Sequence, residues 1–362
     1  MKAITLKRSL SGFAALSAAA LVLAGCAAAP EAPATETEAA APAVEEVDFS
    51  ACAVSDEASW SDKSFNQAVL SGLEEAEAML GVQITAAESL TSDDYGPNLQ
   101  EMVDAQCDVI IAVGFNLVDA VNAAADANPE VNFVTIDGFS MGATNLKTVA
   151  FSMEESSYLA GYLAAAQSTS KIIGTYGGEQ IEILYPFMSG YYYGAQAWAA
   201  EFGQPVTVLG WDPETQNGDF VGSWTDTGVA KSISLAQLEA GADVIFPVAG
   251  GLFSATAEAI SETGSSAVMF GVDADVALTS PQFAGVVLTS VEKRMTNATF
   301  DIIKDTLETG VFNTETYLGT LANGGTGLSS FYELDGSVDA AVKTRLAEIL
   351  AEIIAGTIKP LG

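Results

Sequence analysis

Histidine is absent from the 362-residue sequence, and only 13 lysines and arginines accompany 47 aspartates and glutamates. The absence of histidine excludes Ser-His-Asp and Cys-His nucleophiles and histidine-ligated zinc sites. The formal charge of −34 argues against nucleic-acid binding, because lysine and arginine must replace the counterions of the phosphates. The sequence also carries no nucleophile or metal-site motif. We therefore expect a protein that is not an enzyme and that uses no metal, cofactor or nucleic acid.

Long apolar runs are confined to the N-terminus. Two lysines and one arginine among the first eight residues precede an apolar stretch at 10–23, which is too short for a membrane-spanning helix. The stretch ends in the letters LAGC, which are typical of a bacterial lipobox. We predict that residues 1–25 are a signal peptide and that Cys26 becomes a lipidated N-terminus. An ordinary secretory signal cleaved nearby is the alternative.

Residues 26–47 are rich in Ala, Pro, Glu and Thr and show no apolar periodicity. This composition predicts a disordered tether. The tether would hold the folded body on the extracytoplasmic side of the cell membrane, through the lipid on Cys26.

The rest of the chain alternates Val/Ile-rich runs with amphipathic segments of helical periodicity. Residues 107–114, 242–251 and 267–273 are predicted strands, residues 64–80 are a predicted helix, and a short strand is expected near Phe331. This alternation predicts an α/β fold with two doubly wound parallel sheets, each covered by helices on both faces.

The length exceeds what one hydrophobic core usually serves, so we expect two lobes with a cleft between them. We assign residues 48–150 and 292–318 to one lobe and residues 151–291 and 319–362 to the other. The chain would cross between the lobes near residue 151, near residue 291 and between 315 and 325. Three short crossings would permit the cleft to close on a ligand.

Doubly wound sheets bind ligands at the carboxyl ends of their strands. The predicted strand ends of both halves carry polar residues and glycines, namely Asp56, Gly114-Phe115-Asn116, Asp137-Gly138, Gly250-Gly251 and Asp273. We therefore expect a ligand to lie between the two lobes.

Two cysteines remain after Cys26. Cys52 lies in the first predicted strand and Cys107 opens the third, and these strands are neighbours in a 2-1-3 order. The extracytoplasmic compartment permits disulfides, so we expect a Cys52–Cys107 bridge. Two buried thiols are the alternative.

The loop between the first predicted strand and helix reads WSDKSFNQ at residues 60–67. Asp62 or Ser64 could simply cap the helix. The same segment also supplies polar hydrogen-bonding groups beside the flat ring of Phe65, at a position that faces the expected cleft.

Here the chain resembles the basic membrane protein family, the PnrA-like substrate-binding lipoproteins of ABC importers. The likeness continues in the family's order and spacing over nearly the whole folded region. Its segments are DKSFNQ, IAVGF (111–115), TIDG (135–138), SSYLAGYLAAA (156–166), VGSWTD (221–226), GADVIFPVAGG (241–251), GVDAD (271–275) and VLTSVEK (287–293).

The resemblance implies a type I periplasmic-binding-protein fold that captures a nucleoside, commonly a purine nucleoside. It also implies delivery of that ligand to the permease and ATPase subunits of an ABC importer, and we expect the binding protein itself to be a monomer.

The resemblance further implies that the base lies between two aromatic rings. Phe65 of DKSFN would be one ring, although its helical phase also suits a core residue. Trp224 of VGSWTD stands where the family usually has Phe and would be the other ring; a surface aromatic under a loop is the alternative. The substitution keeps a stacking ring and alters the size of the pocket.

The remaining ligand-binding residues that the resemblance implies are polar residues and one glycine. Asp62, Asn66 and Asp137 match positions near the base edge, and Gly250, Asp273 and Lys293 match positions near the ribose. The structural alternatives are capping for the two strand-end aspartates, a tight turn for Gly250 and a solvated cation for Lys293.

Other ligands and roles stay open at this point. Riboflavin has a fused aromatic system with a polyol, and a simple sugar would suit the same fold. A surface antigen or adhesin would bind no small molecule. A sugar-binding transcription regulator shares the fold, but it would need a basic helix-turn-helix and a cytoplasmic address, and this sequence has a lipobox instead.

Overall fold

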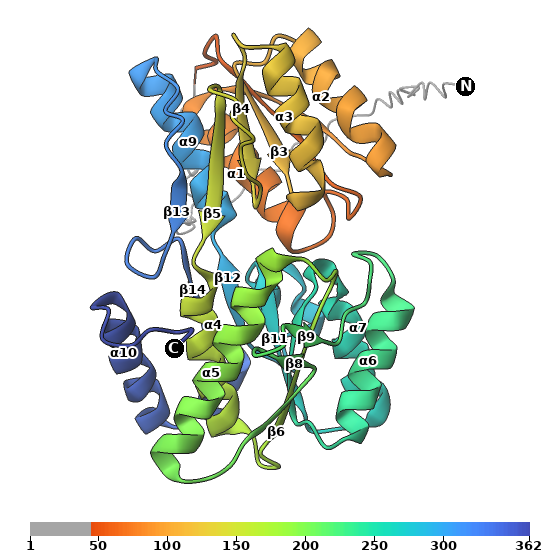
Figure 1. Cartoon of the computed structure of the whole chain (residues 1–362), viewed down its shortest axis with the longest axis vertical. Coiled ribbons are helices and arrows are strands. Elements are labelled where there is room, and N and C mark those ends of the chain that lie inside the picture. The colour runs from red at the N-terminus through yellow and green to blue at the C-terminus, as the bar shows by residue number, and fades with distance from the viewer. Residues whose placement is uncertain (1–44) are drawn as a thin grey trace, which may run out of the picture. The chain divides into compact units, whose positions relative to one another are not determined.

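The computed structural model describes residues 45–362 (Figure 1). The predicted signal peptide, the lipidation site Cys26 and nearly all of the predicted tether lie outside the described residues. Within the described part of the chain, no helix is both long and apolar enough to cross a membrane.

The first sheet has six strands in the order β13-β5-β4-β3-β1-β2, and every pairing in it is parallel. The strands β1, β3 and β4 are buried almost throughout, which explains why their sequences are continuous apolar runs. The strands are β1 (Ser50–Val54), β2 (Gln83–Ala87), β3 (Val109–Val113), β4 (Asn132–Ile136), β5 (Leu146–Phe151) and β13 (Tyr317–Gly319). We use the name lobe I for the part of the chain built on this sheet.

The second sheet has the order β14-β12-β11-β10-β6-β7, and only β14 pairs antiparallel. We use the name lobe II for the part built on it, which also carries a small hairpin. The sheet strands are β6 (Ile172–Gly177), β7 (Thr207–Leu209), β10 (Val244–Val248), β11 (Val268–Asp273), β12 (Val287–Lys293) and β14 (Thr326–Leu328), and the hairpin strands are β8 (Trp211–Asp212) and β9 (Asn217–Gly218).

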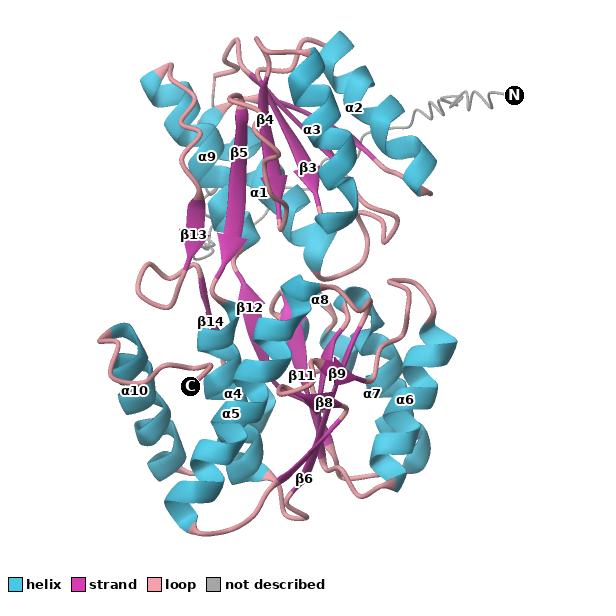
Figure 2. Cartoon of the chain, viewed as in Figure 1, coloured by secondary structure: helices cyan, strands magenta, loops and turns pink. Residues whose placement is uncertain are grey.

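Helices cover both faces of each sheet (Figure 2). In lobe I, one apolar cluster joins the sheet to α1 (Phe65–Leu80) and α9 (Met295–Thr309), and another joins it to α2 (Tyr95–Asp104) and α3 (Val118–Ala127). In lobe II, the helices are α4 (Met153–Gln167), α5 (Tyr185–Phe202) and α10 (Ala340–Ile354) on one side and α6 (Thr227–Glu239), α7 (Phe253–Thr263) and the short α8 (Val276–Thr279) on the other. The predicted α/β fold with two doubly wound sheets is confirmed.

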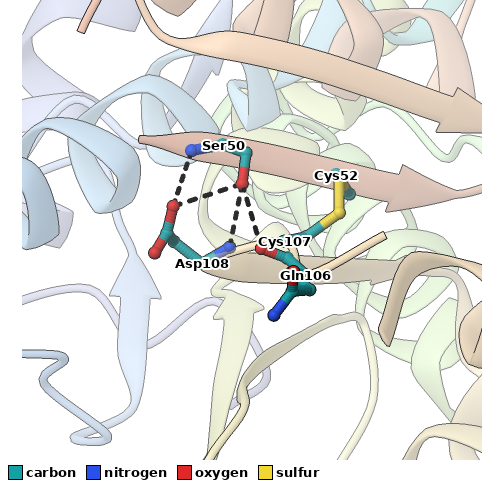
Figure 3. Close-up of a disulfide and its surroundings, with 5 residues drawn as sticks. All are labelled: Ser50, Cys52, Gln106, Cys107 and Asp108. Atoms are coloured by element: carbon teal, nitrogen blue, oxygen red, sulfur yellow. Dashed lines mark hydrogen bonds between the residues drawn. A yellow bond between two sulfur atoms is a disulfide. The ribbon is translucent and has the colours of Figure 1, made fainter. Parts of the chain in front are cut away.

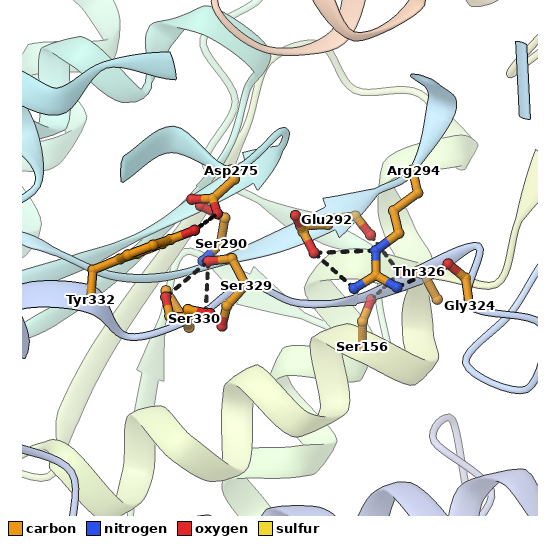
Figure 4. Close-up of polar contacts among 11 residues, drawn as sticks. Ser156, Asp275, Ser290, Glu292, Arg294, Gly324, Thr326, Ser329, Ser330 and Tyr332 are labelled. Atoms are coloured by element: carbon orange, nitrogen blue, oxygen red, sulfur yellow. Dashed lines mark hydrogen bonds and ion pairs between the residues drawn. The ribbon is translucent and has the colours of Figure 1, made fainter. Parts of the chain in front are cut away.

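The chain passes between the two sheets at three places, after β5, after β12 and between β13 and β14. Side chains join two of these crossings (Figure 4). Arg294 Nη1 donates to the carbonyl of Gly324 at 3.0 Å, and Arg294 Nη2 donates to Glu292 at 3.0 Å. Thr326 Oγ1 donates to the carbonyl of Glu292 at 2.7 Å. The crossing segments are therefore tied to one another at the hinge.

The expected strand near Phe331 is wrong in position. The chain pairs earlier, at Thr326–Leu328, and residues 332–337 form a 3-10 turn. Strands of three residues, such as β13 and β14, are too short to show an alternating pattern that the sequence could reveal.

A disulfide joins Cys52 in β1 to Cys107, two residues before β3 (Figure 3). The two strands are parallel neighbours, and Ser50 and Asp108 add hydrogen bonds at the same end of the pair. The bridge closes a separation of 55 residues. In the chain-entropy view, such a loop stabilises the fold by about 4 kcal/mol.

Candidate ligand-binding cleft

A cavity lies between the carboxyl ends of the two sheets, and residues of both lobes line it. The eight residues that the sequence singled out all line this one cavity: Asp62, Phe65, Asn66, Asp137, Trp224, Gly250, Asp273 and Lys293. Other residues complete the walls of the cavity, among them Asp56, Asn116, Ile181 and Phe187. Among residues 45–362, no group of three or more acidic or sulfur side chains is arranged to hold a metal ion.

Lys293 sits at the meeting point of the two lobes. It ends β12, and its ammonium forms an ion pair with Asp137, which follows β4 of lobe I, and lies 4.0 Å from Asp273, which ends β11 of lobe II. All three side chains are buried. Two carboxylates from opposite lobes thus share one ammonium in the interior of the cleft.

The two aspartates of this cluster have an unusual backbone. Asp137 has φ +58° and Asp273 has φ +67°, and both values lie in the left-handed region that side-chain-bearing residues rarely adopt. Such conformations cost free energy and gather at functional sites. Here they turn the carboxylates at the ends of β4 and β11 into the cleft, at corresponding places in the two lobes.

The charge of Asp273 depends on its surroundings. Burial, together with the nearby Asp137 carboxylate, raises the pKa of Asp273 to about 6, although the Lys293 ammonium acts in the opposite direction. From lobe I, Ser64 Oγ lies 3.3 Å from Asp273 Oδ2, within hydrogen-bonding distance. The remaining acceptor capacity of Asp273 is available to a ligand in the cleft.

Helix capping and ligand binding were the two alternatives for Asp62, and its carboxylate makes the capping contacts. Its carboxylate accepts hydrogen bonds from the backbone N–H groups of Ser64 (2.9 Å), Asn66 (2.8 Å) and Gln67 (3.0 Å). The N–H groups of Asn66 and Gln67 belong to the first turn of α1, and Ser64 directly precedes the helix, so none of them has an earlier helical carbonyl to pair with. Asp62 therefore holds the start of α1 and, with it, the position of the Phe65 ring.

Asp56 is a polar residue of the cleft wall that the sequence motifs did not single out. Its Oδ1 accepts from the N–H of Ala58 at 2.9 Å and from Asn66 Nδ2 at 2.7 Å. Burial raises the pKa of Asp56 to about 7. Its place at the end of the first strand was the one sequence feature that indicated a position in the cleft. The neighbouring DKSFN motif was more specific and pointed to other residues.

Asn66 links the two aspartates of this wall. Its side chain is fully buried, and Nδ2 donates to Asp56 and, at 3.2 Å, to Asp62. Within the described part of the chain, Asn66 Oδ1 has no hydrogen-bond partner. A buried amide oxygen of this kind suits a donor group on a ligand.

The two lobes touch each other around the cleft through protein atoms alone. Ser64 Oγ donates to the carbonyl of Val272 at 2.9 Å, and Thr279 Oγ1 donates to the carbonyl of Lys63 at 2.9 Å. A Cβ atom built on Gly251 of lobe II would lie 2.6 Å from the carbonyl oxygen of Asp62. The structure is therefore a closed arrangement of the two lobes.

The fold is that of periplasmic solute-binding proteins. The solved structure of an ABC transporter solute-binding protein from Aeropyrum pernix has a TM-score of 0.75 and 24% identity, covering 86% of this chain and 92% of that one. A transcriptional activator of the comK gene from Bacillus halodurans has a TM-score of 0.67 and 19% identity, covering 86% and 99%. The expected type I periplasmic-binding-protein fold is confirmed, and these likenesses show the fold alone.

The sequence gives the family. Residues 49–358 match the family model described as ABC transporter substrate-binding protein PnrA-like, and the chain belongs to this family, as the resemblance indicated. It is 31% identical over 209 residues to the ABC transporter nucleoside-binding protein BmpA of Lactococcus lactis, covering 57% of this chain and 56% of that protein. It is 29% identical over 255 residues to basic membrane protein D of Borreliella burgdorferi, covering 70% of each. The match thus spans little more than half of the Lactococcus protein.

Proposed function

We propose that this chain is the extracytoplasmic substrate-binding lipoprotein of an ABC importer and that it captures a nucleoside, in the first place a purine nucleoside. The observation that carries the proposal is the composition of one cleft. Four aromatic side chains, Phe65 and Trp224 among them, line the same cavity as a buried carboxylate–ammonium–carboxylate cluster. A nucleoside has the matching parts, a flat base and a ribose with adjacent hydroxyls.

The ribose would lie against Asp273, Lys293 and Gly250. A carboxylate accepts hydrogen bonds from adjacent hydroxyls, and an ammonium donates to their oxygens. Gly250 has φ +53° and begins the 3-10 turn η4 (Gly250–Leu252), so the turn accounts for the glycine, and its missing side chain also lets a ligand approach the backbone.

The base would lie between Phe65 of lobe I and Trp224 of lobe II, with its edge toward Asp56, Asn66 and Asp137. Base–aromatic stacking contributes about 1–3 kcal/mol per base, and the polar edge would fix the orientation. Asp62 would support this edge through Asn66 and the first turn of α1.

The protein would act by closing on its ligand and presenting the closed form to the permease and ATPase subunits. The nucleoside would return intact, because the proposed role includes no reaction. The lipid on Cys26 would keep the monomer at the outer face of the cell membrane. A relative from Pyrococcus abyssi that is 28% identical over 252 residues is named as an uncharacterised lipoprotein, which supports this location.

Native mass spectrometry of freshly purified protein tests the proposal, followed by calorimetric titration with adenosine, guanosine, cytidine, riboflavin and ribose. We expect co-purified or added purine nucleosides to bind with the highest affinity. Tighter binding of riboflavin or ribose would contradict the nucleoside proposal and identify that compound as the better candidate ligand. Binding of none of the five would favour an antigen or adhesin role.

A further inference from the structure

Phe151 is the last residue of β5 and stands where the chain first leaves lobe I. Its half-buried side chain packs against an apolar core cluster of each lobe, the one under α1 and α9 in lobe I and the one under α4, α5 and α10 in lobe II. Among the partly buried hydrophobic side chains of residues 45–362, Phe151 is the one that packs against clusters of both lobes. The ring therefore lies at the junction of the two cores.

A glycine on the neighbouring strand makes room for this ring. Gly319, the last residue of β13, is the parallel partner of Phe151 in the sheet of lobe I, where β5 and β13 lie side by side (Figure 1). A Cβ atom built on Gly319 would lie 2.3 Å from Cδ1 and 2.7 Å from Cε1 of the ring. Carbon atoms in contact are about 3.5–4.0 Å apart, so the ring can lie over β13 only while residue 319 has no side chain.

The contact between Phe151 and Gly319 lies where all three crossings between the lobes meet. The N–H of Ser152, on the first crossing, donates to the carbonyl of Gly319, on the third, at 2.8 Å. The two ends of the third crossing touch, because a Cβ atom built on Gly325 would lie 2.3 Å from Cα of Gly319. The carbonyl of Gly325 in turn accepts from the N–H of Arg294, on the second crossing, at 3.0 Å. The ring is thus seated on backbone that the hinge holds together.

The same ring faces the cation of the cleft. The ammonium of Lys293, at the end of β12, lies 5.8 Å from the ring centre of Phe151, within the distance at which an aromatic face attracts a cation. Phe65 and Phe187 also face this ammonium, but they line the ligand cavity and Phe151 does not. Phe151 therefore contacts the cation from outside the space that a ligand would occupy.

We infer that Phe151 is a positioning residue of the ligand site: seated on Gly319, its ring holds the Lys293 ammonium in place and links that place to the alignment of the hinge. The inference rests on the proposed function, because it requires Lys293 to contact the ligand. Phe151 and Asp137 belong to the sheet of lobe I, whereas Lys293 ends a strand of lobe II. The alignment of the lobes that brings the ammonium to Asp137 also brings it to the ring. Closure of the lobes and placement of the cation are then one event.

The first test needs no ligand. Urea unfolding compares wild type, Gly319→Ala, Phe151→Leu and the double variant. The methyl group of Gly319→Ala has no room beside the ring, so we expect a lower urea midpoint than that of wild type. The smaller leucine leaves space for the methyl group, so the double variant should unfold close to the midpoint of Phe151→Leu alone. Gly336→Ala is the control, because its Cβ meets nothing within 4 Å.

Additive losses in this double-mutant cycle, or an unchanged midpoint in Gly319→Ala, would overturn the packing of the ring on Gly319. Circular dichroism identifies a Gly319→Ala protein that fails to fold. In that case the double variant decides, because the inference predicts that Phe151→Leu restores folding, and a double variant that also fails to fold would contradict it.

A second cycle without ligand combines Phe151→Leu with Lys293→Met. If the ring stabilises the ammonium, its replacement should lower the urea midpoint less in the Lys293→Met protein than in wild type. Equal losses in the two backgrounds would overturn the contact between the ring and the cation.

Calorimetric titration with adenosine and 2′,3′-dideoxyadenosine separates positioning from packing. In the proposed function the ammonium contacts the ribose hydroxyls, which the dideoxy compound lacks. Phe151→Leu should raise the Kd for adenosine by about tenfold and the Kd for the dideoxy compound much less, whereas a structural role alone would weaken both equally. Phe202→Leu removes an exposed ring at the end of α5 and is the control for the loss of an aromatic side chain. Equal losses for the two ligands in Phe151→Leu would overturn the positioning role.

The cycles without ligand keep the two proposals apart. If wild type binds neither adenosine nor the dideoxy compound, the proposed function fails. The two urea cycles would still support or overturn the contacts of Phe151 with Gly319 and with Lys293.

Discussion

Lys293 is the only cation among the described residues that line the cleft, and four aspartates share that lining with it. Its ammonium also lies 5.2 Å from the ring centre of Phe65 and 5.0 Å from that of Phe187. The aromatic faces stabilise a cation whose water has been removed. With one ammonium already paired to a carboxylate and further carboxyl groups around it, the cleft offers no excess positive charge to attract an anion. This electrostatic balance suits an uncharged nucleoside better than a nucleotide.

The first residue-scale prediction concerns the ribose hydroxyls. Asp273→Ala should weaken ribonucleoside binding by about tenfold to a hundredfold, because charge-assisted hydrogen bonds contribute roughly 1.5–3 kcal/mol each. A 2′,3′-dideoxynucleoside never makes these bonds and should lose much less. Calorimetric titration of both ligands against both proteins measures the coupling. A coupling of zero would place Asp273 outside the ribose site.

The second prediction concerns the charge of Asp56. Its pKa is raised from 3.8 to about 7, so between these values the unfolded chain has lost a proton that the folded protein keeps. This contribution to stability is complete below about pH 4 and is lost as the pH rises toward 7. In urea unfolding, wild type should therefore lose stability over this range, by up to a few kcal/mol, relative to Asp56→Asn.

The exposed Asp48 provides the matched control for this series, as Asp48→Asn. Asp273 contributes a pH dependence of the same sign, because its pKa is also raised, and it is present in every protein compared. If the difference between wild type and Asp56→Asn does not vary with pH, Asp56 is not a neutral acid in the folded protein.

At the scale of elements, the start of α1 connects the fold to the site. The helix begins at Phe65, and the carboxylate of Asp62 accepts hydrogen bonds from the N–H groups of Ser64, just before the helix, and of two residues in its first turn. The same turn supplies the ring of Phe65 and the amide of Asn66 to the cleft. A single capping residue thus determines where an aromatic and a polar wall residue lie.

This arrangement predicts different effects for two substitutions of Asp62. Asp62→Ala removes all of these contacts and should lower the free energy of unfolding by about 0.5–2 kcal/mol, whereas Asp62→Asn can keep the oxygen that accepts from Ser64 and Gln67 and should cost less. Urea unfolding of both variants gives the comparison. An equal loss in both would mean that the negative charge, and not the cap, is what matters at this position.

The elements also show how far the sequence alone could go. The long buried strands and amphipathic helices follow from their periodicity, and the polar strand ends follow from the parallel topology. The three-residue strands β13 and β14 carry no such pattern. The roles of Asp56 and Asp62 depend on how each carboxylate is oriented toward α1 and the cleft. The sequence of the loop that contains both residues does not indicate these orientations. The ring of Trp224 lies against Gly178, a residue 46 positions earlier in the chain, and only the three-dimensional structure reveals such a contact.

At the scale of the whole folded body, residues 45–362, the hinge predicts a change of shape. The three crossings are short, and Arg294 and Thr326 tie two of them together, so the lobes should rotate as rigid units. Small-angle scattering should give a smaller radius of gyration with a saturating purine nucleoside than without it. Asp273→Ala at the same nucleoside concentration, below its own Kd, should keep the open profile. An identical profile for wild type in both conditions would contradict a hinge.

The hydrogen bonds from Ser64 to Val272 and from Thr279 to Lys63 join the lobes without any ligand atom. They favour the closed form equally in loaded and empty molecules. An importer that recognises only closure would therefore receive false signals from empty protein, at a frequency set by these few bonds. Strengthening them would raise the apparent affinity for the ligand and, by the same free energy, the number of empty deliveries. In the proposed role, the small number of these cross-lobe hydrogen bonds would limit empty deliveries at the cost of some apparent affinity for the ligand.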